Sequence, residues 1–539
     1  MKSLITKRQL LFVILVLLCC INPIYADTSK ELYVSNGNLS SLLPESERFK
    51  ITDLTLSGKL NIYDLEVIRQ MGGCYKSAGS RYNGHLRYLD LSNAEFVGDG
   101  TLEIHSRNTI MTLRLNGGSG YNLFIDMESL HTIKLPNSME EMGGQLFFGC
   151  DSLTSVTLPK SLKSFPSWYY FVGNFSENDN LTSILIDDSN PYYSSDGSAL
   201  FDKYKTKMFF AVNSLREYAI PSSVSEISGD AFSNCRHLKT LVLPLRLKRE
   251  NVYASIFQNC DSLYSISVDE KNPYLCSDDS ALYNKDKSEL VFVCHTVKKM
   301  SIPSSVTKIG DYAFSNCTNL SSITLPSNVK EIGSSAFQGC KSLTSVTLPS
   351  NVKEIGSSAF QGCKSLTSVT WPSNVKEIGS SAFQGCKSLT SVTLPSCVEK
   401  VCDFAFWSCE SLRSITLPSD LKYIGLSAFL DCTGLTSIYA FMEKPCEIQE
   451  TTFDNETIIN ATLYVPKGSL LDYWDDNQWK KFMNIEEFDA TSIGSLNTNA
   501  NDVQEVSRYS DNGQRLNTPA KGLNIVKYNN GTVKKIMVK

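Results

Sequence analysis

The cysteines of this 539-residue chain are the residues with the widest chemical range, because a thiol can act as nucleophile, metal ligand or disulfide partner. Six of the seventeen recur every 23 residues: Cys317, Cys340, Cys363, Cys386, Cys409 and Cys432. A fixed period places equivalent residues in successive coils, so we expect a ladder of thiols with rungs roughly 4.8 Å apart. Parallel side chains do not converge as a disulfide requires. We therefore interpret these cysteines as reduced structural thiols, with disulfides as the alternative and metal binding as remote.

One unit of the same pattern carries an amide where the others carry a thiol. The sequence from Phe175 to Leu181 matches Phe-x-x-Cys-x-x-Leu, with Asn178 at the cysteine position. Asparagine cannot form a disulfide, but its amide can donate hydrogen bonds to a loop backbone. Asn178 therefore favours a structural role for the whole ladder.

The histidines do not add a reactive site. There are five of them: His85, His105, His131, His237 and His295. None belongs to a helix-borne metal pair, and the chain has neither a glycine-rich phosphate loop nor a nucleophile elbow. Cys294 precedes His295 directly, but neighbours on a strand point to opposite faces. We therefore expect no catalytic, cofactor-binding or metal-binding residues and no enzymatic activity, with an active site hidden in residues 27–145 as a rival hypothesis.

A tandem repeat positions these residues. From Pro326 to Leu394 the sequence PSNVKEIGSSAFQGCKSLTSVTL occurs three times, with Trp371 as the single substitution. A period of 23 residues indicates a solenoid whose coils bury their apolar edges against one another. Trp371 replaces a leucine that is expected to point inward, and its extra volume costs roughly 1–3 kcal/mol in a packed stack. We therefore predict a partly exposed indole or a small local displacement.

A wider form of the pattern covers residues 146–438 in ten units: Cys-x-x-Leu-x-x-Val-x-Leu-Pro-x-x-Val-x-x-Ile-Gly-x-x-Ala-Phe. It resembles the BspA-type leucine-rich repeat of bacterial surface proteins, also called the Treponema pallidum type. The resemblance implies a leucine-rich repeat solenoid with one short β-strand per 23-residue coil and with caps at both ends. It also implies a protein that mediates protein–protein binding or adhesion to host matrix or other cells.

Two insertions interrupt the repeat, and both have the same sequence organisation. Each adds about 34 residues to one period, near residues 187–220 and 269–302, and each begins with an Asn-Pro turn at Asn190 or Asn272. Alternating apolar residues follow, so we predict two β-hairpin insertions. Their acidic turns lack the spacing of a calcium site and are interpreted as solvated turns.

The amino terminus has the features of an export signal in residues 1–26. Lys2, Lys7 and Arg8 precede an apolar run that is too short for a confident membrane span, and cleavage is expected before Asp27. A lipid anchor on Cys19 or Cys20 is the less favoured alternative. We expect a secreted or cell-surface protein, associated with the outer membrane, whose mature chain has no transmembrane span.

The remaining segments flank the repeats. Residues 27–145 keep strand-like apolar spacing and are interpreted as an amino-terminal cap with divergent repeats. Residues 439–489 resemble the closing cap of the repeat family, and residues 490–503 are a polar linker. Residues 504–539 resemble the carboxy-terminal sorting domain of the type IX secretion system. That resemblance implies a small β-sandwich and a Bacteroidetes protein carried across the outer membrane.

The surface of the repeats offers two kinds of polar residue. Hydroxyl residues alternate with buried ones in the three copies: Ser345, Thr347, Ser368, Thr370, Ser391 and Thr393. We identify them as the candidate binding face, which would gain avidity through repetition. The Lys-Glu pairs that start at Lys330 are interpreted as a solvated edge whose charges cancel. A formal charge of −5 argues against nucleic acid, so the expected partners are proteins of host matrix or of other bacterial surfaces.

A glycan-binding surface protein is the alternative function. Its stacking platforms would be the tyrosines of the two insertions, Tyr192 and Tyr193 in the first and Tyr274 in the second.

Overall fold

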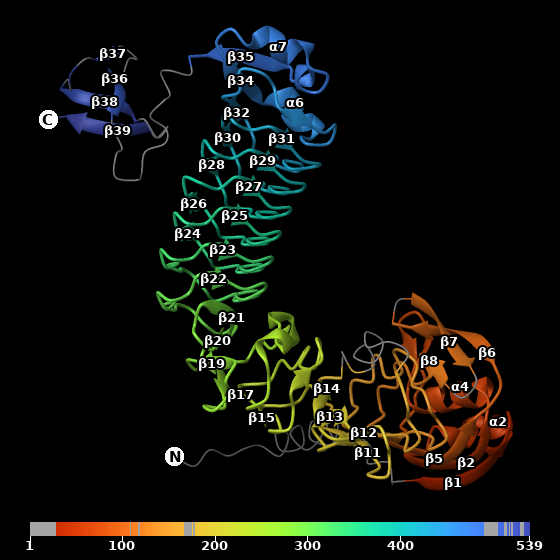
Figure 1. The fold of residues 1–539 in the computed structure, drawn as a ribbon. Coiled ribbons are helices and arrows are strands. Elements are labelled where there is room, and N and C mark those ends of the chain that lie inside the picture. The colour runs from red at the N-terminus through yellow and green to blue at the C-terminus, as the bar shows by residue number, and fades with distance from the viewer. Residues whose placement is uncertain are drawn as a thin grey trace, which may run out of the picture. The chain divides into compact units, whose positions relative to one another are not determined.

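The computed structural model describes residues 28–107, 109–116, 119–165, 175, 178–489, 505–510, 515–516, 518, 521–528 and 533–538. The predicted export signal at 1–26 and the predicted linker at 490–503 lie outside these residues. The chain divides into two compact units, Met1–Tyr274 and Leu275–Lys539, each built of coiled repeats around its own apolar core (Figure 1). Within the described residues, no helix combines the length and the apolar character that crossing a bilayer requires.

The first unit starts with a six-stranded parallel sheet. Its strands are, in spatial order, β1 (Ser29–Ser35), β2 (Asp53–Leu60), β5 (Tyr88–Phe96), β9 (Thr132–Lys134), β10 (Ser155–Leu158) and β11 (Ser183–Ile186). Helices α2 (Leu39–Leu42), α3 (Glu45–Arg48) and α4 (Ile62–Met71) lie between β1 and β5 in the chain. Helix α4 begins at a capping box, in which Asn61 and Asp64 accept each other's backbone amides. The segment interpreted as cap and divergent repeats therefore already has coil-like strand pairing.

Shorter antiparallel elements complete the beginning of this unit. They are the pair β3 (Tyr75–Ser77) and β4 (Ser80–Arg81), and the three-stranded sheet of β6 (Gly100–Ser106), β7 (Thr109–Asn116) and β8 (Ser119–Tyr121).

The two insertions have the same strand arrangement. The first contains β12 (Tyr193–Ser195), β13 (Ala199–Asp202) and β14 (Lys207–Ala211), and the second β19 (Leu275–Ser277), β20 (Ala281–Asn284) and β21 (Glu289–Val293). Neighbouring strands within each triplet run antiparallel. The third strand of each triplet then pairs in parallel with the next coil, β14 with β16 (Glu226–Ile227) and β21 with β22 (Lys308–Ile309). The insertions are thus continuous with the sheet of the solenoid.

The asparagine of each Asn-Pro turn ties its insertion to the preceding coil. Asn190 and Asn272 are fully buried. The Asn190 amide donates to the carbonyls of Lys160 and Leu162 at 2.9 Å, and the Asn272 amide donates to those of Pro244 and Leu247. Buried backbone carbonyls need such partners, so these asparagines have a structural role.

The rest of the first unit consists of coils with short parallel strands. They are β15 (Glu217–Ala219), β17 (Thr240–Leu243) and β18 (Ser265–Val268), with the 3-10 turns η1 (Arg249–Asn251) and η2 (Ala254–Phe257) between the last two strands.

The coils of the second unit carry two rows of short strands (Figure 1). The first row continues from β22 through β23 (Glu331–Ile332), β25 (Glu354–Ile355), β27 (Glu377–Ile378), β29 (Lys400–Val401), β31 (Tyr423–Ile424) and β33 (Glu447–Ile448). The second row contains β24 (Ser345–Thr347), β26 (Ser368–Thr370), β28 (Ser391–Thr393), β30 (Ser414–Leu417), β32 (Ser437–Ala440), β34 (Thr462–Pro466) and β35 (Asn484–Phe488). The second row is the strand that the sequence predicts, and the return segment of each coil adds the first row.

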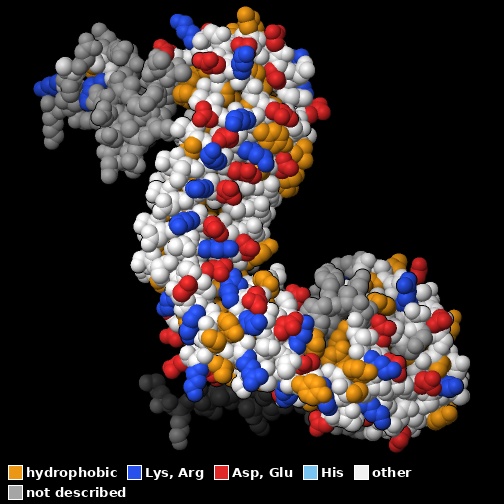
Figure 2. Space-filling view, in the orientation of Figure 1, with side chains coloured by type: hydrophobic (Ala, Val, Ile, Leu, Met, Phe, Trp, Pro, Cys, Tyr) orange, Lys and Arg blue, Asp and Glu red, His pale blue; other side chains and the backbone are white. Residues whose placement is uncertain are grey.

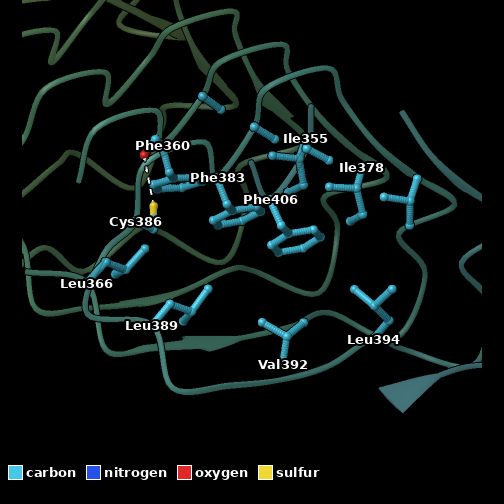
Figure 3. Packing of buried hydrophobic residues seen from close by; sticks show 14 of the residues in the cluster. Ile355, Phe360, Leu366, Ile378, Phe383, Cys386, Leu389, Val392, Leu394 and Phe406 are labelled. Carbon is cyan, nitrogen blue, oxygen red and sulfur yellow. Dashed lines mark hydrogen bonds between the residues drawn. The ribbon is translucent and has the colours of Figure 1, made fainter. Parts of the chain in front are cut away.

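A column of phenylalanine rings fills the centre of the second unit. The rings of Phe337, Phe360, Phe383 and Phe406 stack with centroids 5.1 to 5.3 Å apart and planes within 8° of parallel. Leucine, valine and isoleucine side chains of the same coils surround them (Figure 3). Side chains one period apart therefore occupy equivalent places, which is the arrangement that a 23-residue repeat predicts.

Each of these coils also turns through a left-handed residue directly before its cysteine. This position is Asn316, with a φ of 59°, in one coil and Gly362, with a φ of 71°, in the copy that ends at Trp371. Ser408 and Asp431 adopt the same conformation in two later coils, both with a φ of 57°. Glycine and asparagine adopt this conformation at the lowest cost.

The carboxy-terminal part of the repeats is closed by helices and aromatic side chains. Helices α6 (Asn455–Asn460) and α7 (Leu470–Asp475) and the 3-10 turn η3 (Trp479–Lys481) follow the last regular coil. Trp479 and Tyr473 are fully buried, and each donates a hydrogen bond to a coil carbonyl, of Cys446 and Met442 respectively. Buried aromatic residues with a satisfied polar group suit a cap, because they cover the last coil.

The described residues near the carboxy terminus form one antiparallel sheet of four strands. The strands are β36 (Glu505–Ser510), β37 (Arg515–Leu516), β38 (Gly522–Tyr528) and β39 (Val533–Val538), in the order β37-β36-β38-β39. The resemblance to a sorting domain implies a small β-sandwich, and a second layer is not found among the described residues.

Candidate functional site

The repeating thiols lie in one row along the second unit. All six cysteines of the ladder are buried and free of disulfides. The Cys386 Sγ donates to the Phe360 carbonyl of the preceding coil at 3.3 Å, and Cys340, Cys363, Cys409 and Cys432 make the same contact at 3.1 or 3.2 Å (Figure 3). Burial raises the pKa of the Cys386 thiol well above its usual value. A protonated thiol in an apolar stack is a poor nucleophile, so the row is a structural feature.

Asn178 occupies the corresponding place in the first unit. It is fully buried, and its amide donates to the carbonyls of Phe147 and Cys150 at 3.1 and 3.0 Å. Phe147 is the phenylalanine of the preceding coil, so the amide bonds the same carbonyl that a thiol bonds elsewhere. Among the described residues the buried Asn178 Oδ1 has no hydrogen-bond partner, which is the cost of placing an amide where a thiol fits.

The structure brings the candidate binding face together as an exposed strip of hydroxyls. Ser345 pairs in register with Ser368, and Thr347 with Thr370, while Ser391 and Thr393 lie in the next strand. All six side chains are exposed. The strip therefore offers neutral groups that donate and accept hydrogen bonds at a constant spacing along the coils.

The strip has one discontinuity, and it lies at Trp371. The indole is partly exposed, as the sequence predicts, and its ring meets that of Phe383 edge-on at 5.3 Å. Within the described residues β26 pairs with β24 but not with β28, which instead starts a new sheet with β30. Val369 is also more exposed than its equivalents in the neighbouring copies. The larger side chain therefore separates two coils that are otherwise built alike.

Charged residues line a groove along the first row of strands. The groove has a volume of about 920 Å³ and includes Lys308, Glu331, Glu354 and Glu377 among its lining residues. Figure 2 shows positive and negative side chains intermixed along these coils. Ion pairs join Lys308 to Glu331 at 3.6 Å and Lys400 to Glu377 at 3.5 Å. Exposed pairs of this kind contribute little to stability, so the interpretation as a solvated edge remains the simplest.

The charge order reverses at one coil of the first row of strands, next to the groove. Where the three copies have Lys-Glu, the next coil has Glu399 followed by Lys400. Glu399 accepts hydrogen bonds from Lys422 and Lys376, which lower the pKa of its carboxyl group. Cys402 in the same coil donates to Glu377 at 2.9 Å, and burial together with that carboxylate raises its pKa to about 11. This thiol is therefore not poised for nucleophilic chemistry.

The insertion tyrosines differ in their surroundings. The ring of Tyr193 packs against Phe165 and Phe209, and its hydroxyl donates to the Lys163 carbonyl. Tyr192 and Tyr274 are 49% and 44% exposed. Tyr193 thus has a structural role, and each insertion presents a single open ring at the positions that the sequence singled out.

The described part of residues 27–145 contains a group of charges that lies inside the core. Arg69 is fully buried, with its guanidinium 2.6 Å from Glu66 and 3.3 Å from the Ile125 carbonyl. Asp126 is also fully buried, and burial raises its pKa. Burial also raises the pKa of the Cys74 thiol to about 12. Groups held inside the core cannot meet a substrate, so this cluster offers no support for an active site here. Among the described residues, no cluster of three or more histidine, cysteine or acidic side chains could hold a metal ion.

Comparison with known families gives one sequence match. The family model described as a BspA type leucine rich repeat region matches residues 119–205, 201–293, 287–385 and 353–473, which together exceed half of the chain. A search of curated proteins finds no match.

A search of solved structures finds leucine-rich repeat proteins at low identity. A leucine-rich repeat protein from Eubacterium ventriosum is 20% identical, with 76% of this chain and 84% of that chain covered and a TM-score of 0.42. A leucine rich cell surface protein from Faecalibacterium prausnitzii is 21% identical, with 63% and 86% covered and a TM-score of 0.37. The T. pallidum leucine rich repeat protein is 24% identical, with 46% and 88% covered and a TM-score of 0.24. The match to the family model carries the assignment.

Proposed function

Because the chain belongs to the BspA-type leucine-rich repeat family, we propose that it is an exported, surface-displayed protein that binds other proteins. The observation that carries this proposal is the exposed strip of hydroxyls from Ser345 to Thr393, repeated along the coils. Protein partners bind such a surface through many weak contacts, whose effects multiply when several coils are engaged together. Proteins of host matrix or of other bacterial surfaces are the partner class that the family resemblance supplies.

Export and anchoring form the second part of the proposal. The basic and apolar residues before Asp27 support secretion, and the segment from Glu505 onward supports type IX sorting to the outer surface. The sorting segment would then be removed or exchanged for a surface anchor. Mass spectrometry of the protein from its native host should find a mature chain that begins at Asp27 and lacks the four strands near the carboxy terminus.

A pull-down from host matrix and bacterial surface extracts tests the binding proposal. The full chain is compared with a variant that lacks residues 326–348, one complete period, whose removal joins Leu325 to Pro349 as in the natural repeat. The amount of partner protein captured should be smaller for the variant that lacks one coil, because avidity depends on the number of coils engaged. Equal capture by both chains would contradict binding along the repeats, and no capture from either extract would refute the proposed partner class.

Matched substitutions in the three copies locate the binding face. One variant changes the hydroxyl strip: Thr347→Lys, Thr370→Lys and Thr393→Lys. The control changes serines of the same copies elsewhere on the coil: Ser334→Lys, Ser357→Lys and Ser380→Lys. The first variant should lose capture and the second should keep it, since both add three charges to the same coils. Capture that survives only in the first variant would place the binding face elsewhere.

A further inference from the structure

The strip of hydroxyls ends in a group of aromatic side chains. Thr393 pairs in register with Thr416, Thr416 with Tyr439, and Tyr439 with Tyr464, so one outward column changes from threonine to tyrosine. These residues lie on β28, β30, β32 and β34, which are consecutive strands of one sheet (Figure 1). The column is therefore continuous in space although its members are more than 20 residues apart in the chain.

The tyrosine rings stack on each other along the direction of the column. The centroids of Tyr439 and Tyr464 are 4.7 Å apart and their planes differ by 10°. Phe488 meets Tyr439 edge-on at 6.1 Å and Phe441 edge-on at 5.1 Å. All four rings are only partly buried. The packing of this aromatic cluster fixes the orientation of Tyr439 before any ligand arrives, which lowers the entropic cost of binding.

One face of Tyr439 is covered and the other borders a short side chain. Tyr464 covers the first face, whereas the next residue in the column on the other side is Thr416. Because threonine is much shorter than tyrosine, the column has a step at this point, with the Tyr439 ring as its wall and Thr416 as its floor. We call this step the Tyr439 notch. A flat ring placed on the open face of Tyr439 would continue the stack.

The wall and the floor of the Tyr439 notch are uncharged, and hydroxyl residues lie beside them. Ser414 and Ser437 pair in register with each other in the adjacent outward column. The outward positions of β24, β26 and β28 are likewise serine and threonine. Charged residues lie around the aromatic cluster: Arg413 precedes the first residue of β30, and Glu486 pairs with Tyr464 on the far side of the stack. Glu443 and Asp489 follow Phe441 and Phe488 in the chain. None of them belongs to the wall or the floor of the notch.

We infer that the Tyr439 notch binds a neutral saccharide. A sugar ring has apolar C–H faces that pack on an aromatic ring, and it has a rim of hydroxyls that both donate and accept hydrogen bonds. The Tyr439 ring supplies the first kind of contact, and Ser414, Thr416 and Ser437 supply the second. A charged polymer would find no counter-charge in the notch, and burying its charges there would be unfavourable. This site is independent of the protein partner proposed above.

Affinity electrophoresis of the full chain in gels containing neutral polysaccharides tests the inference. The probes are xyloglucan, galactomannan, mixed-linkage β-glucan and α-mannan, with heparin and polygalacturonate as anionic comparisons. At least one neutral probe should retard the chain, and the anionic probes should not. No retardation by any neutral probe, or retardation by the anionic probes alone, would overturn the inference.

Two variants and one control connect the retardation to the notch. Thr416→Glu fills the floor with a charged side chain while leaving the aromatic cluster intact, and Tyr439→Thr with Tyr464→Thr removes the wall. Each should weaken retardation by about tenfold or more, the loss that corresponds to one good stacking contact. Tyr423→Thr, on strand β31 of the other row, should leave retardation unchanged. Unchanged retardation in the Thr416→Glu variant would refute the site even if the double variant failed to fold.

Discussion

Replacing Trp371 by leucine should stabilise the solenoid, because it removes the discontinuity between β26 and β28. In the coils on either side, the Leu348 amide donates to the Thr370 carbonyl at 3.0 Å and the Leu394 amide to the Thr416 carbonyl at 3.1 Å. Among the described residues, the equivalent bond from the Trp371 amide to Thr393 is not formed. Trp371→Leu restores the side chain with which the other two copies close this gap between coils.

The expected magnitude follows from two hydrogen bonds that form and one pair of rings that separates. The Thr367 amide donates to the Thr344 carbonyl, and among the described residues the equivalent bond from the Thr390 amide to Thr367 is also not formed. Forming the Trp371 and Thr390 bonds gains about 1 kcal/mol each. Removing the edge-on packing of Trp371 against Phe383 costs about 0.5–1.5 kcal/mol. The free energy of unfolding should therefore rise by about 0.5–1.5 kcal/mol. The reverse change in an identical copy, Leu348→Trp, should lower it by about 1–3 kcal/mol.

Urea unfolding followed by far-ultraviolet circular dichroism measures both changes, and hydrogen exchange of the peptide that contains β28 shows whether its amides become protected. Trp371→Leu should raise the unfolding midpoint and slow the exchange of β28, whereas Leu348→Trp should lower the midpoint and expose β26. A clear fall in the midpoint for Trp371→Leu, or unchanged exchange in β28, would refute the reasoning.

Three further changes probe the stack. Cys386→Ala removes a buried sulfur and its bond to Phe360, so the unfolding free energy should fall by about 1–2 kcal/mol in the same urea assay. Burial raises the pKa of Cys150 from about 9 to about 12. The protonated thiol should therefore make its whole contribution to the free energy of unfolding below pH 9, and this contribution should be lost as the pH rises toward 12. A urea midpoint that stays constant from pH 8 to 10.5 would contradict this. Gly362→Ala should lower the free energy of unfolding by about 1–2 kcal/mol, because alanine is unfavourable at this left-handed φ. Gly362→Asn should change it little, since Asn316 already adopts the same conformation in another coil. Thermal unfolding distinguishes the two variants.

Periodicity explains why much of the architecture follows from the sequence. A residue such as Phe360 or Cys386 contacts its own equivalents one period away, so the spacing in the chain predicts the contact in space. The partial exposure of Trp371 follows by the same argument. The other two copies have leucine at this position, so the space inside the coil fits leucine and is too small for an indole. Asn178 shows that the rule extends to the first unit, where an amide takes over the hydrogen bond of a thiol.

The aromatic cluster could not be found in this way, because it lies where the period changes. Tyr439, Tyr464 and Phe488 are separated by 25 and 24 residues instead of 23, and a helix intervenes between the first two. Only the strand register shows that Tyr439 and Tyr464 continue the threonine column. The return strands such as β25 were also not expected as strands, since two residues are too few for an alternating pattern.

The account depends most on the coils being stacked in register, and the anomalous scattering of sulfur in a crystal of the full chain measures this directly. The six sulfur atoms from Cys317 to Cys432 should appear as one row of evenly spaced peaks, roughly 4.8 Å apart. Peaks that merge in pairs at disulfide distance, or that scatter without a common line, would contradict the stacking and with it the repeated binding face.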